Sequence, residues 1–362
     1  MIVFCHLLND NSGSPVVLKS VIEALSPVDA NLVLLVGSQG QGCLDTAGIP
    51  IRRYWYHRSR FRFITLFTYL FSQASLYRAL NRADLPADAV IYVNTLLPFG
   101  AALWGRRNGR TVIYHVHEVS ITPGLMRRFL TRIVEKCAQH AFYVSEDQRK
   151  RLPIVDVPST VLPNPVTPEI AKNGLDTPYS PRRSGVFEVL MLASPRDFKG
   201  VPEYLDLARR LIRREDVRFT LVLNAVEHEI DTYLPAASRP ANVTIHSRTD
   251  TPELFYATAD VVVNLSRVDR WVETFGMTIV EGMAFGLPVI APPVGGPVEI
   301  VTDGREGYLV DSRDEFSLEE RLLSLIDDRA NAMSMSKAAR RRAQDFSMDR
   351  FADTLRLRIY HS

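Results

Sequence analysis

Short apolar runs alternate with polar loops along the first half of the chain. The apolar runs cover residues 1–8, 31–37, 89–93, 111–116 and 141–145, and residues 49–56, which Arg52 and Arg53 interrupt, are predicted to be a further strand. Continuous apolar runs of this length are typical of strands that are buried on both faces of a parallel sheet. Residues 16–25 have helical spacing, and Pro15 suits the first turn of that helix. The first half is therefore predicted to be a parallel α/β domain.

The second half repeats this organisation. Apolar runs that predict strands cover residues 187–193, 218–224, 242–246, 260–265, 287–291 and 307–310, and helical spacing covers 201–213, 251–259, 277–285, 316–326 and 331–359. Residues 167–185 are rich in proline, serine and charge, which is typical of a linker. The pattern predicts two α/β domains, residues 1–166 and residues 186–336.

The stretch from Glu273 to Gly296 is the most informative part of the chain. Glu273-Thr274-Phe275-Gly276 is predicted to be a tight turn that leads into a short helix. The free N–H groups at such a helix start favour an anion, most often a phosphate. Glu281 lies about one helical turn past Met277. One acid beside the phosphates and a second acid beyond them suit a sugar nucleotide, the first for hexose hydroxyls and the second for the ribose diol.

This stretch closely resembles the donor-site signature of the retaining GT-B glycosyltransferases of family 4. Its two glutamates are separated by seven residues and are followed by Gly-Met-Ala-x-Gly-x-Pro-Val-Ile and a Gly-Gly loop. The Phe-Gly turn, Gly286, Pro288 and the Gly-Gly loop stand in register with that signature. The resemblance covers nearly the whole chain, specifically from Lys199 to Val310 and more loosely before that. The alternative is an ordinary helix–strand unit with two solvated glutamates.

The resemblance implies an α/β chain of the GT-B fold, with two Rossmann-like domains that face each other across a cleft. The first domain, residues 1–166, would bind the acceptor, and the second, residues 186–336, would bind the nucleotide sugar. Residues 337–362 would form a C-terminal helix that crosses back and packs on the first domain. Residues 160–166 resemble the segment that closes the first domain in the family, with Pro165 where glycine is usual.

The resemblance also implies a phosphate clamp in the second domain. Lys199-Gly200 match the Lys-Gly pair of that clamp, whereas Ser194 stands where the clamp arginine is usual, and Arg196 is the candidate for the missing charge. Fixed cations are needed because the leaving diphosphate gains negative charge as the glycosidic bond breaks. The predicted donor-binding residues of this domain are Arg196, Lys199, Thr274, Phe275, Gly276 and Glu281, and Glu273 is predicted to be catalytic through the sugar hydroxyls.

Two places in the first domain are further candidates. Gly13 and Ser14 lie in the loop after the first strand, where family 4 enzymes have glycines near the donor phosphates and the acceptor; a purely structural turn is the alternative. His117 follows strand 111–116, at the carboxyl end where α/β sheets place ligands. The family commonly has a histidine there beside the transferred sugar, so we expect His117 to be catalytic, with Glu118 orienting it or touching the acceptor. A structural histidine is the alternative.

Residues 52–82 are basic and aromatic and contain no acidic residue. They hold the basic residues Arg52, Arg53, Arg58, Arg60, Arg62, Arg78 and Arg82 and the aromatic residues Tyr54, Trp55, Tyr56, Phe61, Phe63, Phe67, Tyr69 and Phe71. Such a segment suits peripheral contact with an anionic membrane, and it equally suits a lipid-diphosphate acceptor. The other interpretation is an amphipathic helix with aromatics in the core and solvated arginines. RNA binding is less favoured, because no nucleic-acid module surrounds the segment.

The composition is that of a soluble globular protein. The chain of 362 residues is 46% hydrophobic and 23% charged, and its net charge of +2 gives no argument for nucleic acid as a partner. Cys5, Cys43 and Cys137 show no pairing or metal spacing, which favours a reducing cytoplasm. The N-terminus lacks signal-peptide features, and no apolar run is long enough to span a bilayer. We expect a cytoplasmic protein, peripheral on the inner face of the cytoplasmic membrane if residues 52–82 bind lipid.

The predicted function is transfer of a sugar from a nucleoside-diphosphate sugar to a hydroxyl of a saccharide or lipid-linked saccharide, in polysaccharide or lipopolysaccharide biosynthesis. The resemblance implies a retaining reaction without a metal or other cofactor, and no DxD-type motif stands out. A non-catalytic sugar-nucleotide-binding or scaffold protein of the same fold is the alternative, which the Ser194 departure favours and the glutamate pair disfavours. A nicotinamide or flavin oxidoreductase is disfavoured, because the first loop lacks G-x-G-x-x-G.

Overall fold

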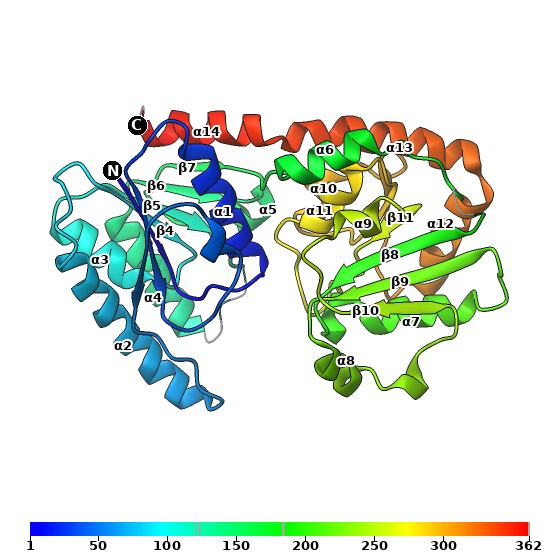
Figure 1. The fold of residues 1–362 in the computed structure, drawn as a ribbon, viewed down its shortest axis with the longest axis horizontal. Coiled ribbons are helices and arrows are strands. Elements are labelled where there is room, and N and C mark those ends of the chain that lie inside the picture. The colour runs from blue at the N-terminus through cyan, green and yellow to red at the C-terminus, as the bar shows by residue number, and fades with distance from the viewer. Residues whose placement is uncertain (120, 122–123, 183–184, 361–362) are drawn as a thin grey trace. The chain divides into compact units, whose positions relative to one another are not determined.

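The computed structural model describes residues 1–119, 121, 124–182 and 185–360, and the side chain of Arg62 lies outside this described part. The chain divides into two compact units (Figure 1). Unit 1 comprises Met1–Pro165 together with Met348–Ser362, and unit 2 comprises Val166–Ser347. Each unit has its own parallel sheet and hydrophobic core. Across the described ranges, no helix has both the length and the apolar character that crossing a bilayer requires.

The sheet of unit 1 has seven parallel strands in the order β3-β2-β1-β4-β5-β6-β7. The strands are β1 (Ile2–His6), β2 (Leu32–Gly37), β3 (Ile51–Tyr54), β4 (Val90–Asn94), β5 (Val112–Val116), β6 (His140–Tyr143) and β7 (Ser159–Val161). The strand order reverses between β1 and β4. The loops after these two strands therefore leave room for a ligand at the carboxyl edge of the sheet.

Helices cover both faces of this sheet. They are α1 (Gly13–Leu25), α2 (Arg62–Asn81), α3 (Phe99–Arg107), α4 (Gly124–Cys137), α5 (Glu146–Arg151) and α14 (Met348–Tyr360), with the short 3-10 helix η1 (Cys43–Thr46). Val3 and Cys5 of β1 belong to the core under α2, α3 and α4, whereas Ile2 and Phe4 belong to the core under α1 and α14. Successive side chains of a strand point to opposite faces, which explains why β1 is apolar at consecutive positions.

Unit 2 repeats this plan with six parallel strands in the order β10-β9-β8-β11-β12-β13. The strands are β8 (Phe187–Ala193), β9 (Val217–Leu223), β10 (Val243–His246), β11 (Val261–Val263), β12 (Val289–Ala291) and β13 (Gly307–Leu309). The order reverses between β8 and β11, which makes the loops after these strands the expected ligand site. The predicted fold class, two parallel α/β halves, is confirmed.

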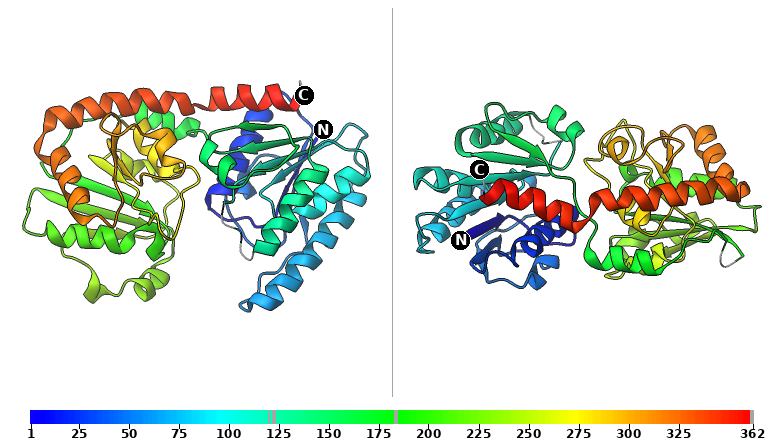
Figure 2. Two further views of the ribbon diagram at one scale, coloured as in Figure 1. Left: turned by 180° about the vertical axis from the view of Figure 1, so that it is seen from behind. Right: turned by 90° about the horizontal axis from the view of Figure 1, so that it is seen from above.

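Helices also flank the sheet of unit 2, as Figure 2 shows from behind. They are α6 (Pro168–Asp176), α7 (Val201–Arg210), α8 (Glu227–Tyr233), α9 (Glu253–Tyr256), α10 (Met277–Ala284), α11 (Pro297–Ile300), α12 (Glu315–Asp327) and α13 (Arg329–Ala343), with η2 (Asp197–Lys199), η3 (Ala236–Ser238) and η4 (Gln344–Phe346). The main core lies where α7 and α12 pack on β8 and β9, and it includes Tyr204, Phe219 and Leu322.

Helix α6 occupies part of the stretch that we expected to be a linker. Thr167 caps it, because its hydroxyl accepts a hydrogen bond from the Ile170 N–H, and proline in the first turn suits a helix start. The helix packs on α10, where a Cβ at Gly174 would lie 2.5 Å from the carbonyl oxygen of Ala284. Residues 168–176 are therefore an integral helix of unit 2.

The helical pattern over residues 331–359 corresponds to two helices and not to one. Ser347 is extended, with φ of −69° and ψ of 152°, so the helical path ends after η4 and restarts at Met348. Phe346 is buried, and its carbonyl oxygen accepts a hydrogen bond from the Val166 N–H over 2.8 Å. As a result, α13 belongs to unit 2 and α14 belongs to unit 1.

Candidate functional site

Unit 2 brings two loops together at the carboxyl edge of its sheet. One loop follows β8 and runs through residues 194–200 into α7, and the other follows β11 and runs through residues 264–276 into α10. The Arg267 N–H donates to the carbonyl oxygen of Phe198 over 2.9 Å and ties the loops to each other. Because β8 and β11 meet where the strand order reverses, this edge is where such sheets bind ligands.

The predicted clamp lysine and the first predicted acid form an ion pair at this edge. Lys199 Nζ donates to Glu273 Oε2 over 2.7 Å, and Ser266 Oγ donates to the same oxygen over 3.1 Å. The side chains of Lys199 and Glu273 are only 20% and 15% exposed, so water and salt screen their attraction less than on an open surface. A cation and an acceptor oxygen therefore lie side by side, available to a phosphate and to a sugar hydroxyl.

An aromatic stack supports the ion pair. The rings of Phe198 and Trp271 are stacked with their centroids 5.0 Å apart, and Lys199 Nζ lies 4.8 Å from the centroid of the Trp271 ring. The face of an indole attracts a cation, so Trp271 holds the ammonium group from one side. The Nε1–H of Trp271 is buried and finds no hydrogen-bond partner in the described part of the chain, which leaves one donor beside the pair unused.

The N-terminus of α10 follows directly after Glu273. Gly276 precedes the helix with a φ of 112°, a backbone conformation that favours glycine. The Gly-Gly loop packs on the same turn, because the Gly296 N–H donates to the carbonyl oxygen of Glu273 over 2.8 Å and a Cβ at Gly295 would lie 2.3 Å from that oxygen. This packing fixes the turn that precedes α10. The first N–H groups of α10, at the end of this turn, have no hydrogen-bond partner inside the helix.

Glu281, the second predicted acid, lies one turn into α10 and is partly buried. Its Oε2 accepts a hydrogen bond from the hydroxyl of Tyr256 over 2.7 Å. Burial raises the pKa of Glu281 to about 7, although the hydrogen bond from Tyr256 acts in the opposite direction. The carboxyl group therefore gains or loses its proton near neutral pH, and Tyr256 fixes its orientation.

The remaining predicted donor residues lie in the same two loops. Arg196 is exposed, and within the residues covered by the structure its guanidinium makes no hydrogen bond or ion pair. Its N–H donates to the carbonyl oxygen of Ser194 over 2.7 Å. Phe275 is buried against Phe346, with ring centroids 5.7 Å apart, so only its backbone is open to a ligand. Thr274 is partly exposed in the same turn.

In unit 1, His117 lies at the carboxyl end of β5, where the sequence predicted it. Its Nε2 is 2.9 Å from Asn94 Oδ1. The amide nitrogen of Asn94 donates to the carbonyl oxygen of Ser14 over 3.1 Å, and this bond fixes the orientation of the amide. Because Asn94 Oδ1 must then be the acceptor, His117 carries its proton on Nε2 and leaves Nδ1 free to accept.

Three histidines gather around Asn94. Its amide nitrogen lies 3.1 Å from His6 Nδ1, the rings of His115 and His117 have centroids 4.3 Å apart, and His115 Nδ1 bonds the hydroxyl of Tyr92 over 2.9 Å. Burial lowers the pKa of His6 to about 4 and that of His115 to about 3. Burial and the neighbouring His115 hold the pKa of His117 well below its ordinary value. His117 is therefore a neutral imidazole at physiological pH.

Gly13 and Ser14 form the first turn of α1 beside this cluster. A Cβ at Gly13 would meet no atom within 4 Å, so the protein itself does not require glycine there. Ser14 supplies the carbonyl oxygen that orients Asn94. The carboxylate of Glu118 accepts from backbone N–H groups, including that of His117 itself, and not from the imidazole. Glu118 therefore does not orient the imidazole, which is hydrogen-bonded to Asn94 instead, and the alternative that Glu118 touches the acceptor stays a prediction.

Tyr256, Asn94 and His6 are side chains of these two clusters that were not identified from the sequence. Asn94 ends β4, and a polar residue at the end of an apolar strand next to the strand reversal is a signal by which it can be found. Tyr256 gives no such signal, because it lies 25 residues before Glu281 and only the folded sheet brings the two together.

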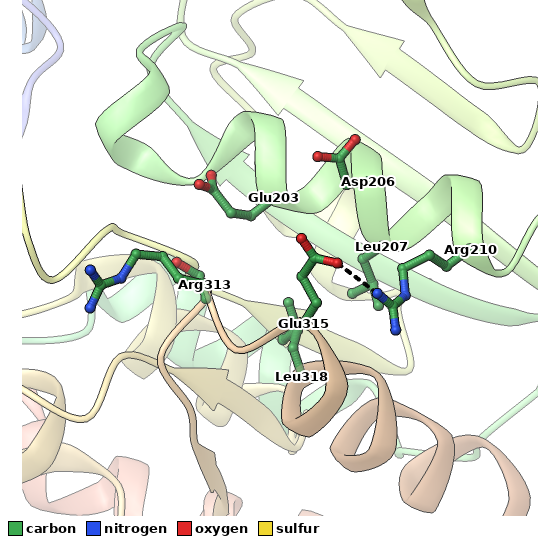
Figure 3. Close-up of a pocket in the computed structure, with 8 residues that line it drawn as sticks. Glu203, Asp206, Leu207, Arg210, Arg313, Glu315 and Leu318 are labelled. Atoms are coloured by element: carbon green, nitrogen blue, oxygen red, sulfur yellow. Dashed lines mark hydrogen bonds and ion pairs between the residues drawn. The ribbon is translucent and has the colours of Figure 1, made fainter.

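A separate cavity of about 160 Å³ lies between α7 and the start of α12 in unit 2 (Figure 3). Charged side chains line it, and Arg210 donates to Glu315 across it over 2.7 Å. Small-molecule sites usually enclose about 300–1,000 Å³, so this cavity is too small for a nucleotide sugar. Among the residues that the structure describes, no group of three or more His, Cys, Asp or Glu side chains is arranged to hold a metal ion.

Residues 180–342, which lie within unit 2, match the family described as "Glycosyl transferases group 1". The D-inositol 3-phosphate glycosyltransferase of Arthrobacter sp. (strain FB24) is 33% identical over 188 residues, which are 49% of this chain and 43% of that relative. The probable sucrose-phosphate synthase 5 of Oryza sativa subsp. japonica is 36% identical over 129 residues, which are 35% of this chain and 12% of that relative. The chain thus spans less than half the length of these curated relatives.

Solved structures resemble the chain over its whole length. The structure of Anabaena HepE in complex with UDP has a TM-score of 0.79 and 18% identity, and covers 100% of both chains. Sucrose-phosphate synthase from Thermosynechococcus elongatus has a TM-score of 0.74 and 16% identity, and covers 98% of this chain and 97% of that one. What these proteins share with the chain is the fold. The chain therefore has the GT-B fold, and its unit 2 carries the match to the glycosyl transferases group 1 family.

Proposed function

We propose that this chain is a glycosyltransferase that moves a sugar from a nucleoside-diphosphate sugar to an acceptor hydroxyl. The observation that carries the proposal is the ion pair of Lys199 and Glu273 beside the N-terminus of α10. A cation and a helix N-terminus suit a diphosphate, and a carboxylate next to them suits sugar hydroxyls. All of these groups fall within residues 180–342, the part of the chain that matches the glycosyltransferase family.

In the proposed complex, Lys199 and the backbone of Phe275 and Gly276 hold the diphosphate. Arg196, exposed in the loop after β8, adds the second positive charge in place of the arginine that Ser194 replaces. Thr274 belongs to the same turn. Glu273 accepts hydrogen bonds from the hydroxyls of the transferred sugar, and its bond to Lys199 is exchanged for a bond between Lys199 and phosphate.

Glu281 is proposed to bind the ribose hydroxyls through its carboxylate, with Tyr256 holding the group in position. The structures of Anabaena HepE contain, by their titles, UDP, UDP with glucose, and UDP-glucose. UDP-glucose is therefore the first donor to test on this chain, followed by other UDP- and GDP-sugars.

The proposed transfer retains the configuration at the anomeric carbon. The bond from that carbon to the diphosphate oxygen breaks, and the acceptor oxygen bonds to the same face of the sugar. The leaving diphosphate oxygen takes the proton of the acceptor hydroxyl, so atoms and charge balance without a separate protein base. Lys199, Arg196 and the N–H groups at the start of α10 stabilise the charge that the leaving oxygen gains. We propose that the reaction uses no metal or other cofactor.

For unit 1 we propose acceptor binding, with a saccharide or lipid-linked saccharide of polysaccharide or lipopolysaccharide assembly as acceptor and the cytoplasm as the place of action. His117 is proposed to contact the transferred sugar as a neutral imidazole, and Gly13 and Ser14 to lie near the donor phosphates. The support is the position of these residues at the strand-reversal edge of the sheet of unit 1, together with the orientation that Asn94 gives the imidazole.

The test uses the purified chain and a panel of nucleotide sugars, read by thermal shift and by release of nucleoside diphosphate. Lys199→Ala removes a charged hydrogen bond, worth about 1.5–3 kcal/mol, and is expected to weaken donor use about 10- to 150-fold. Lys337→Ala, at an exposed lysine on α13, is the matched control. Unchanged donor use in Lys199→Ala contradicts the proposed site, and a chain that neither binds nor turns over any nucleotide sugar contradicts the function.

A non-catalytic sugar-nucleotide-binding protein is the second candidate. The observations that favour it are Ser194 in the clamp-arginine position and the neutralisation of Lys199 by Glu273. Thermal stabilisation by a nucleotide sugar without hydrolysis or transfer, in the presence of a panel of saccharide acceptors, supports this candidate. Release of nucleoside diphosphate above the rate of the Glu273→Ala variant excludes it.

A further inference from the structure

Helix α2 has two apolar faces on opposite sides. Successive residues of a helix are rotated by about 100° about its axis. One side of α2 therefore carries Tyr69, Leu76 and Leu80, which are all buried in the core of unit 1. The opposite side carries exposed apolar residues over an arc of about 160°. These residues are Phe63, Ile64, Leu66, Phe67, Leu70 and Phe71. A helix needs one apolar stripe to pack on its own domain, so the second face is not explained by the core of unit 1.

The exposed face is large. Phe63 is 82% exposed, Phe67 is 73% exposed, and Phe61, just before the helix, is 64% exposed. With Phe71 included, four phenylalanines at about 150–250 Å² each present roughly 400–700 Å² of aromatic surface. Soluble monomers rarely expose contiguous apolar patches above a few hundred Å², and larger patches mark interaction sites. The N-terminal half of α2 projects past the end of the sheet of unit 1 (Figure 1, Figure 2).

Positive charge surrounds this face. Arg58 and Arg60 are exposed in the segment that leads into α2. Arg78 and Arg82 are exposed near the end of the helix, and helical periodicity puts them on the same side as the exposed phenylalanines. No acidic residue occurs in residues 46–83. The arrangement combines an apolar centre with a cationic border.

The neighbouring helix α4 also exposes apolar and basic side chains. Aromatic contacts link Tyr69 of α2 to Phe99 of α3, with ring centroids 5.9 Å apart, and Phe99 to Phe129 of α4, with centroids 5.2 Å apart. Phe129 is itself 45% exposed, and Leu125, one turn earlier on α4, is 76% exposed. Arginines 128 and 132 on α4 are exposed as well. The apolar and basic surface therefore spreads from α2 towards α4.

We propose that this surface docks unit 1 on an anionic lipid bilayer. The phenylalanines of α2 enter the boundary between headgroups and acyl chains, and the arginines stay at the headgroup level beside anionic lipids. Trp55, 43% exposed and in edge contact with Phe71 at 5.0 Å, sits at the interface, where tryptophan is favoured. A second copy of the chain fits less well, because a self-complementary interface would place these arginines against one another.

The proposal is tested with the purified chain and sedimenting vesicles, without donor or acceptor. Vesicles made of equal parts of phosphatidylglycerol and phosphatidylcholine are expected to bind the chain, and vesicles of phosphatidylcholine alone to bind it at least about tenfold more weakly, because several arginines lose their anionic partners. Added salt is expected to weaken binding to the anionic vesicles. Vesicle binding that depends neither on the lipid charge nor on the salt concentration overturns the proposal.

Variants separate the apolar from the charged contribution. The double variant Phe63→Ser/Phe67→Ser is expected to lose at least about tenfold in vesicle affinity, since each buried phenylalanine contributes substantially. Phe316→Ser removes a phenylalanine of α12 that is 80% exposed and is expected to change nothing. Arg58→Glu/Arg60→Glu is expected to lose more than about 20-fold, at about fivefold per neutralised arginine. Arg213→Glu/Arg329→Glu, at exposed arginines of unit 2, is the charge control.

Tryptophan fluorescence gives a second readout. Adding anionic vesicles is expected to shift the emission to shorter wavelength, and Trp55→Phe is expected to abolish the shift while binding persists. Equal binding by the phenylalanine variants and Phe316→Ser overturns the proposal. So does concentration-dependent dimerisation that those variants abolish, or binding to RNA in place of vesicles. Because vesicle binding needs no sugar nucleotide, its outcome is independent of the outcome for glycosyl transfer.

Discussion

Lys199 Nζ and Glu273 Oε2 are 2.7 Å apart, so the proposed clamp lysine of unit 2 and the acid next to α10 neutralise each other. The two residues are 74 positions apart in the chain and meet because they follow neighbouring strands, β8 and β11. A diphosphate that binds Lys199 has to compete with Glu273 for the ammonium group. In the proposed complex, binding of the leaving group and positioning of the sugar would therefore be coupled through this one hydrogen bond.

Glu273→Gln is expected to separate binding from turnover. The amide keeps the shape of the side chain but no longer neutralises Lys199, so affinity for free UDP is expected to rise by about tenfold, the lower end of the value of one charged hydrogen bond. The same variant is expected to lose at least about 100-fold in kcat, because the sugar contact matters in the transition state. Calorimetry with UDP and single-turnover kinetics measure the two effects. Weaker UDP binding together with normal kcat contradicts the assigned roles.

Donor affinity is expected to depend on pH through Glu281. Because its pKa lies at about 7, the carboxylate is replaced by the neutral acid as the pH falls below that value. The KM for the donor is therefore expected to rise between about pH 8 and about pH 6. Glu281→Gln is expected to show a weaker affinity, about 10- to 150-fold, without this pH dependence. A KM that has the same pH profile in both proteins contradicts the ribose contact.

Glu281 is also expected to lower stability at neutral and alkaline pH. Folding raises the pKa of Glu281 from 4.5 to about 7. The contribution of the protonated acid to folding stability is therefore complete below pH 4.5 and is lost as the pH rises through about 7. Glu281→Gln is therefore expected to be more stable than the natural chain at about pH 8, by up to about 3 kcal/mol. The advantage is expected to vanish near pH 4.5. Urea unfolding at both pH values measures it, and a difference of the opposite sign refutes the assignment.

Asn94→Ala is expected to impair catalysis without impairing donor binding. The variant releases the His117 imidazole from the tautomer and orientation that Asn94 imposes, and a loss of about tenfold in kcat with unchanged donor KM is expected. Tyr92→Phe, which removes the hydrogen bond on His115, is the control for a purely structural loss. The natural chain is expected to show no kcat titration near 6.5, because His117 stays neutral. An equal effect of both substitutions argues for a structural histidine cluster.

Gly295→Ala is expected to destabilise unit 2 more than Gly304→Ala. Both glycines have positive φ, 81° and 76°, so both variants bear the cost of an unfavourable backbone conformation, about 1 kcal/mol. Only at Gly295 would the added Cβ approach a backbone oxygen, that of Glu273, at 2.3 Å, whereas at Gly304 it meets nothing within 4 Å. An additional loss of about 1–3 kcal/mol is expected for Gly295→Ala. Denaturant unfolding of the two variants gives the comparison, and equal losses contradict the proposed packing.

Most strands were predictable because they are largely apolar runs, and β8 matches its predicted bounds, residues 187–193. The short strand β7 was not predicted, because Ser-Thr-Val at residues 159–161 is not an apolar run. The candidate residues Lys199, Glu273 and Glu281 were predictable because a family signature fixes their spacing. Their partners were not. Tyr256 is hydrogen-bonded to Glu281, 25 residues away, and Asn94 is hydrogen-bonded to His117, 23 residues away. These pairs depend on strand order and helix placement, which local sequence patterns do not encode.

The aromatic residues of α2 illustrate a second limit. Tyr69 enters the core as the amphipathic-helix interpretation requires, but Phe63 and Phe67 do not. A sequence that is apolar on two sides of a helix has no single periodic signal, so the pattern alone does not tell which side is covered. In the folded protein the two sides differ, because Leu76 and Leu80 are buried with Tyr69 in the core of unit 1.

Helix α14 makes unit 1 discontinuous along the chain, and this has a consequence during synthesis. Phe351 and Leu355 are buried in the core against α1, so the first 165 residues lack part of their core until α14 has left the ribosome. Unit 2 is contiguous and is complete earlier. The usual order, in which the N-terminal domain folds first, is therefore inverted in this protein: the half that is made first is expected to finish folding last.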